Sequence, residues 1–137
     1  MILFFLVNIF DIMAYVKREY YPSGKLKFEW FEINGIKEGE IKSYYENGIL
    51  TICNYVNGIK EGEEKGYYSD GKLYVICNYV NDKREGEYKS YYWNGQPLSI
   101  GNYVNGLKEG EFKEYYKNGE LKWICNYVNG EEKSFRY

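Results

Sequence analysis

Four copies of a Glu-x-Lys-x-Tyr triplet contain the residues whose types and spacing could support binding or catalysis. The three side chains of each triplet lie on one face of an extended strand, because alternate residues of a strand point the same way. Paired carboxylates can act as acid and base, but nothing distinguishes one of four equivalent pairs as catalytic. The interpretation we favour is a solvated ladder of charges beside amphipathic tyrosines, which suits protein binding; the alternative is that the tyrosines only pack. The candidate binding residues, here called the Tyr/Lys strip, are Tyr44, Tyr67, Tyr91, Tyr115, Lys42, Lys65, Lys89 and Lys113.

Other catalytic chemistry has little support in the sequence. Histidine is absent, which excludes Ser-His and Cys-His pairs and metal sites with histidine ligands. The segment 66–72 matches the first seven positions of a phosphate-binding loop, but Leu73 replaces the Ser or Thr that would hold magnesium. We therefore expect no enzyme, with no catalytic residue, cofactor or metal site.

Three cysteines, Cys53, Cys77 and Cys125, occupy equivalent positions, and Gly101 takes that position in the remaining regular unit. Equivalent strands of successive hairpins lie about 9.6 Å apart, too far for a disulfide or a shared zinc. We therefore expect the cysteines to pack as small apolar residues. Their odd number and the absence of an Asn-x-Ser/Thr sequon favour a cytoplasmic, intracellular location.

The elements that position these residues are repeats. Paired tyrosines begin at residues 20, 44, 67, 91 and 115, so the chain repeats about every 24 residues. The regular unit contains two alternating, β-rich segments joined by Asn-Gly, a pair that tolerates positive φ and closes hairpin turns. In the first unit Pro22-Ser23-Gly24 stands in place of that pair. The second unit lacks one residue between Gly48 and Cys53, which predicts that its second strand bulges or shortens, with a local kink.

The recurring pattern resembles a known family. Glu-Gly-Glu, an aromatic residue, Lys, Tyr-Tyr and Asn-Gly, followed by Asn-Tyr-x-Asn-Gly-x-x-Glu-Gly, is similar to the MORN repeat. The similarity is to the variant form found in bacterial proteins labelled as antitoxin components and in large DNA viruses. It covers about residues 16 to 137 in five units. It implies an all-β fold, an elongated antiparallel β-meander of about ten strands.

The two ends of the chain depart from this pattern. Residues 1–15 are predicted to be an apolar N-terminal cap on the repeat array of residues 16–137, because terminal repeats are atypical and hide an edge. A secretory signal or membrane anchor within residues 1–13 is the alternative, although Asn8 and Asp11 interrupt the apolar run. Residues 15–21 and 131–137 are expected to form the first and last strands.

Charge and family resemblance together set the functional expectation. The chain has 18 basic and 20 acidic residues without a basic block, which argues against nucleic acid as a partner. The resemblance implies a non-enzymatic scaffold for protein-protein interaction or self-assembly. Two alternatives stay open: binding of a toxin partner, as in antitoxins, and association with a membrane surface or phospholipid, for which residues 1–10 offer an insertable segment.

Overall fold

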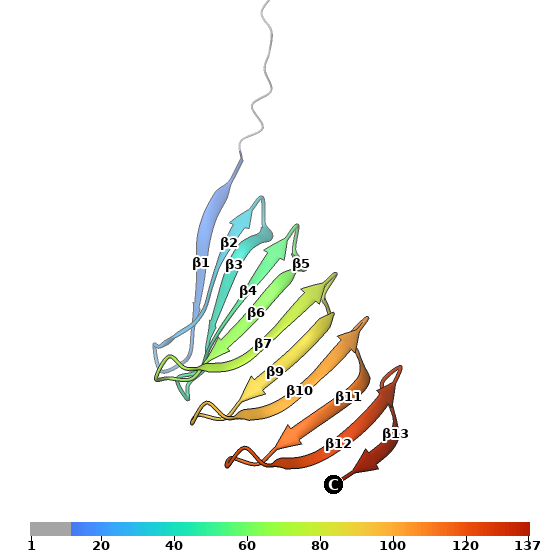
Figure 1. Ribbon diagram of the computed structural model, residues 1–137. Coiled ribbons are helices and arrows are strands. Elements are labelled where there is room, and N and C mark those ends of the chain that lie inside the picture. The colour runs from blue at the N-terminus through green and yellow to red at the C-terminus, as the bar shows by residue number, and fades with distance from the viewer. Residues whose placement is uncertain (1–11) are drawn as a thin grey trace, which may run out of the picture.

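The computed structural model describes residues 12–137, which form a single antiparallel sheet (Figure 1). The predicted cap falls largely on residues 1–11 and so lies outside the described residues. The strands are β1 (Ala14–Tyr20), β2 (Leu26–Ile33), β3 (Ile36–Tyr44), β4 (Leu50–Val56), β5 (Ile59–Lys60), β6 (Gly62–Tyr67), β7 (Leu73–Val80), β8 (Lys83–Arg84), β9 (Gly86–Tyr91), β10 (Pro97–Val104), β11 (Leu107–Tyr115), β12 (Leu121–Val128) and β13 (Glu131–Arg136).

The strands follow one another across the sheet in chain order, so the predicted meander is confirmed. Residues 12–137 contain 13 strands rather than about ten. Part of the excess arises because Glu61 separates β5 from β6 and Glu85 separates β8 from β9. The first and last strands, β1 and β13, lie where the sequence predicted them.

Two kinds of turn connect the strands. At one edge Asn34-Gly35 and its equivalents have positive φ at both residues, as a two-residue hairpin turn requires. At the other edge only the glycine has positive φ, as at Gly119 (φ 86°), whose N–H donates to the carbonyl of Tyr116 at 2.9 Å. The turn expected at Asn118-Gly119 is therefore present, but it is longer than a two-residue turn and has a single left-handed residue, Gly119.

The short second unit is the most regular hairpin in the sheet. The pairing of β3 with β4 runs from Gly39 opposite Tyr55 to Tyr44 opposite Leu50 without a shift. The equivalent hairpins of the other four units each contain a register shift near the same place. The predicted bulge in the short unit was therefore wrong: its missing residue is the bulge residue itself, which is Tyr74 in the next unit. The alternative of a shortened strand is confirmed, because β4 has 7 residues and the equivalent strands β7, β10 and β12 have 8 each.

Buried side chains lie mainly on one face of the single layer, here called the core face. Cross-strand pairs such as Ile41 with Cys53 and Phe112 with Cys125 form its centre, and Phe112 is only 1% exposed. The buried apolar residues are Ile41, Cys53, Val75, Cys77, Phe112 and Cys125. The opposite face carries the Tyr/Lys strip and is called the strip face.

Successive units are joined by side-chain hydrogen bonds. The first carboxylate of each Glu-Gly-Glu motif accepts the backbone N–H of the asparagine in the next turn along the same edge of the sheet, at 2.7 to 2.9 Å; the pairs are Glu38 with Asn57, Glu61 with Asn81, Glu85 with Asn105 and Glu109 with Asn129. The hydroxyls of Tyr21, Tyr68 and Tyr92 donate to carbonyls one unit further on. The carboxylate bonds thus connect successive turns, and the tyrosine bonds connect three of the four pairs of neighbouring units within residues 12–137.

Candidate functional site

The structure places the Tyr/Lys strip on one face of β3, β6, β9 and β11. Each tyrosine is the last residue of its strand and is partly buried. Each lysine forms an ion pair with the glutamate two residues earlier, with Nζ to carboxylate distances of 3.2, 2.5, 2.7 and 3.2 Å from Lys42 to Lys113. The strip is therefore a series of identical modules, one on every second main strand.

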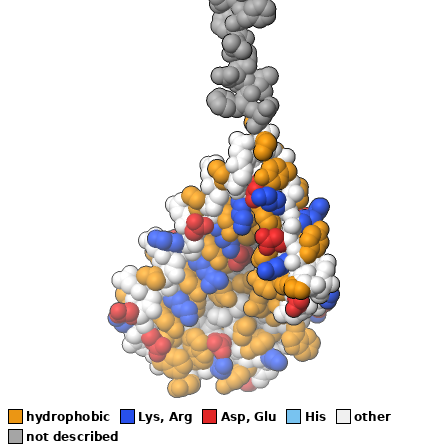
Figure 2. Space-filling view, turned by 180° about the vertical axis from the view of Figure 1, so that it is seen from behind, with side chains coloured by type: hydrophobic (Ala, Val, Ile, Leu, Met, Phe, Trp, Pro, Cys, Tyr) orange, Lys and Arg blue, Asp and Glu red, His pale blue; other side chains and the backbone are white. Residues whose placement is uncertain are grey.

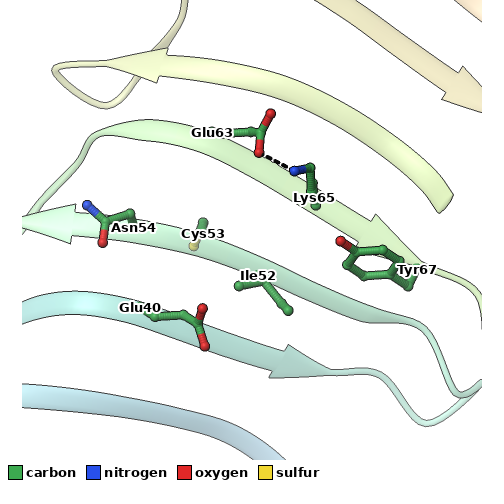
Figure 3. A pocket seen from close by; sticks show the side chains of 7 residues that line it. All are labelled: Glu40, Ile52, Cys53, Asn54, Glu63, Lys65 and Tyr67. Atoms are coloured by element: carbon green, nitrogen blue, oxygen red, sulfur yellow. Dashed lines mark ion pairs between the residues drawn. The ribbon is translucent and has the colours of Figure 1, made fainter. Parts of the chain in front are cut away.

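Lys65 and Tyr67 line a pocket of about 280 Å³ between β3, β4 and β6 (Figure 3). Ile52 and Asn54 contribute from β4, and Cys53 also lines the pocket. Glu40 and Glu63 lie on the flanking strands on either side of β4. The pocket thus combines apolar surface, an aromatic ring, an amide and two carboxylates.

The same arrangement recurs one hairpin further along the sheet. A pocket of about 470 Å³ is lined by Ile76 and Asn78 from β7 and by Glu87, Lys89 and Tyr91 from β9. Leu73, Cys77, Glu85 and Gly86 complete its lining. Glu63 lines both pockets, so the two adjoin.

The pockets lie where neighbouring strands part. β4 pairs with β6 only from Leu50 to Ile52, so Asn54 has no partner residue in β6. The strand breaks at Glu61, whose N–H donates to the Asn54 carbonyl at 2.9 Å, and Gly62 follows with φ of 81°. A Cβ on Gly62 would meet nothing within 4 Å, so backbone conformation rather than crowding requires glycine there.

Carboxylates dominate the exposed charge of both pockets. Glu87 exposes 63% of its side chain and Lys89 exposes 34%, and the Glu63 and Lys65 side chains are 53% and 40% exposed. The hydrogen bond from each lysine to its glutamate raises the pKa of Lys65 and of Lys89, so both lysines keep their charge at neutral pH. A cationic group on a ligand can therefore reach the glutamate, which is the more exposed member of each ion pair.

Only half of the predicted strip lines these two pockets. Lys42 lines a depression of about 100 Å³ near β1 and β2, and Tyr44, Lys113 and Tyr115 lie outside both pockets. Sequence reasoning missed the residues that the intervening strands contribute: Ile52, Asn54, Ile76 and Asn78. Their signal was the Ile-x-Asn alternation of the second segment in each unit.

The core face carries a second series of residues that sequence reasoning missed. Lys60 Nζ lies 3.8 Å from the ring centre of Tyr79, and Lys108 Nζ lies 4.7 Å from those of both Phe112 and Tyr127. Lys37 and Arg84 occupy equivalent places. Basic and acidic side chains are interspersed with hydrophobic ones in the view from behind (Figure 2). Because cations and rings engage each other here, this series stabilises the sheet.

The cysteines are free, buried and on the core face, as expected for packing residues. Burial raises the pKa of the Cys53 and Cys77 thiols. The segment 66–72 joins β6 to β7 as a hairpin, which a phosphate-binding loop does not. Within residues 12–137 no cluster of three or more Cys, Asp or Glu side chains could hold a metal ion, and no helix there is long and apolar enough to cross a membrane.

Comparison with known sequences agrees with this architecture. The family described as MORN repeat variant matches residues 16–31, 37–57, 60–81, 84–105 and 108–129. A search of the curated proteins finds no match. The matched segments cover more than half of the chain and recur at the period of the hairpins, so the chain belongs to the MORN repeat variant family.

Proposed function

We propose that this chain is a non-enzymatic scaffold that binds another protein through its strip face. One observation carries the proposal: two adjoining pockets with the same lining lie on the face that holds few of the buried side chains. A repeated pocket on a rigid sheet can engage several side chains of one partner at once. Proteins of this family are generally associated with protein and membrane interactions.

The chemistry of the pockets favours a protein partner over a membrane. Tyr67 and Tyr91 offer large rings with polar tips, a combination enriched where proteins bind. Each strip lysine is matched by a glutamate, so the strip has no net positive charge to attract anionic lipid. The location of the protein and the identity of its partner stay predictions.

The test is the double variant Tyr67→Ser/Tyr91→Ser, compared with Tyr45→Ser/Tyr116→Ser. The control tyrosines are 51% and 50% exposed and lie outside both pockets. Crosslinked partners would be counted by mass spectrometry, and folding would be followed by circular dichroism. We expect the pocket variant to lose partners that the wild type and the control retain, with its β signal unchanged. Equal capture by both variants would contradict the proposal, and a collapsed pocket variant would show that these tyrosines are structural.

A further inference from the structure

We propose that the two pockets bind one peptide segment of a partner in polyproline II conformation, with a basic side chain at every third position. The inference rests on the proposed function, because it specifies the chemistry of the partner for the same surface. Three features of the pockets carry it: their spacing, their direction across the strands and their charge.

The spacing of the pockets matches the period of a polyproline II helix. Ile52 pairs with Lys65, and Lys65 pairs with Ile76, so the isoleucines that line the two pockets are two paired strands, or about 9.6 Å, apart. A polyproline II helix has three residues per turn and rises about 3.1 Å per residue, so side chains i and i+3 point the same way about 9.3 Å apart. An extended β-strand instead presents same-facing side chains about 6.8 Å apart.

An α-helix fits this surface less well. It reaches a comparable spacing only after two turns, with side chains i and i+7 about 10.5 Å apart. The side chains of the intervening turn would then meet Glu63 and Lys65, which form an ion pair between the two pockets. A polyproline II segment places only one turn between the two anchoring side chains and avoids that contact.

The direction of the groove excludes addition of a strand to the sheet. The pockets follow one another from β4 to β7, so a peptide that fills both crosses the strands and makes no ladder with them. Affinity must then come from side chains and rings. Tyr67 and Tyr91 line successive pockets, and aromatic side chains are the usual docking surface for proline-rich segments.

The charge of the pockets selects the anchoring side chains. Glu40 and Glu63 flank the first pocket, and Glu63 and Glu87 line the second. The ion pair with Lys65 uses Oε1 of Glu63, and Oε2 of Glu63 takes part in no ion pair or hydrogen bond within residues 12–137. A guanidinium on the ligand can therefore bind that oxygen without displacing the lysine.

The match applies to two neighbouring pockets rather than to the whole array. Adjacent strands of a sheet are rotated by roughly 20 to 25°, so successive pockets turn away from a straight ligand. The occupied segment is therefore short, with its two basic residues three positions apart.

The test uses a fluorescent peptide made of three Pro-Pro-Arg units and the complete chain. Three comparison peptides are needed: a permuted peptide of the same composition whose three arginines are two positions apart, one with Glu in place of each Arg, and one helical with Arg at i and i+7. Fluorescence anisotropy would give each dissociation constant. We expect the Pro-Pro-Arg peptide to bind at least about tenfold more tightly than each of the others.

Protein variants locate the binding. Glu63→Gln removes a charge that both pockets share, and we expect it to weaken binding of the Pro-Pro-Arg peptide about five- to tenfold. Glu111→Gln is the matched control, because Glu111 lies on the same face outside both pockets and forms the equivalent pair with Lys113. It should leave binding unchanged.

Several outcomes would overturn the inference. Equal binding of the permuted peptide would indicate unspecific attraction of charge, and tighter binding of the helical peptide would show that the groove holds a helix. Absence of binding by all peptides, or equal loss in Glu63→Gln and Glu111→Gln, would also refute it. If the Tyr67→Ser/Tyr91→Ser variant still loses its protein partners in that case, the scaffold function stands and only the polyproline ligand is wrong.

Discussion

Gly101 should be intolerant of the cysteine that three other units carry at the same position. A Cβ built on Gly101 would lie 2.4 Å from Cε1 of Phe112 and 2.5 Å from two further ring atoms. That ring cannot move outward freely, because it is 1% exposed and makes edge-on contacts with Tyr103 and Tyr127. The Gly101→Cys variant must therefore strain the core face.

The magnitude follows from two opposing effects. Overpacking of a core costs about 1 to 3 kcal/mol. Replacing glycine also restricts the unfolded chain, which returns about 0.4 to 1 kcal/mol. We expect a net destabilisation of about 1 to 2 kcal/mol, measured as a lower urea midpoint with an unchanged m-value.

A double-mutant cycle separates overpacking from other effects of the new side chain. In a Phe112→Leu background the ring is gone, so Gly101→Cys should cost less than about 0.5 kcal/mol. The coupling between the two positions should then reach about 1 kcal/mol. If Gly101→Cys is as stable as the wild type, or equally destabilised in both backgrounds, the ring is not what requires glycine.

Two further predictions follow from the hydrogen bonds and pKa values. The Tyr68 hydroxyl donates to the Tyr91 carbonyl at 2.7 Å, so Tyr68→Phe should lower the free energy of unfolding by about 0.5 to 1.5 kcal/mol. Tyr45→Phe should leave the free energy of unfolding unchanged, because Tyr45 belongs to the short unit and makes no such bond within residues 12–137. Equal shifts of the urea midpoint in the two variants would contradict this prediction. Burial raises the pKa of the Cys53 and Cys77 thiols from 9.0 and, with a hydrogen bond to Cys125, raises the pKa of Tyr127 from 10.0 to about 12. Because these pKa values are higher in the folded protein than in the unfolded chain, keeping the groups protonated stabilises the fold. This stabilisation is complete below pH 9.0 and declines toward about pH 12. The free energy of unfolding from urea melts should therefore be lower at about pH 11 than at neutral pH, and equal values would refute the effect.

The repeat, the hairpins and the face of the strip could be predicted because each depends on local spacing. Residues two apart share a face of a strand wherever it pairs, so Lys65 and Tyr67 had to lie together. The two-residue turns could be predicted for a similar reason, since Asn-Gly supplies both positive φ values.

The bulges and pockets could not be predicted in this way. When one unit is a residue shorter than the others, the sequence shows that either the short or the long hairpin is bulged, but not which of them. The structure places the bulge in the four longer units. The pockets depend on where β4 and β6 stop pairing. That point is set jointly by both strands and by the positive φ of Gly62 at the start of β6, so the spacing within one strand does not reveal it. The aromatic partners of Lys60 and Lys108 were hidden because those lysines lie on the strand face opposite the strip.

The recurrence of Glu-Gly-Glu does not by itself identify a binding surface, because each of its residues has a structural role. In the unit around Gly62, Glu61 holds the N–H of Asn81 in the next turn at 2.9 Å. Gly62 supplies the positive φ that parts the strands, and Glu63 pairs with Lys65. A loss of binding in Glu63→Gln therefore counts only against its matched control Glu111→Gln, and the strip needs a second test at residues that line the first pocket without these roles, which are Ile52, Asn54 and Tyr67. If such variants lose partner binding while the hydrogen bonds that hold the sheet together stay intact, the strip has a binding role beyond its role in the fold.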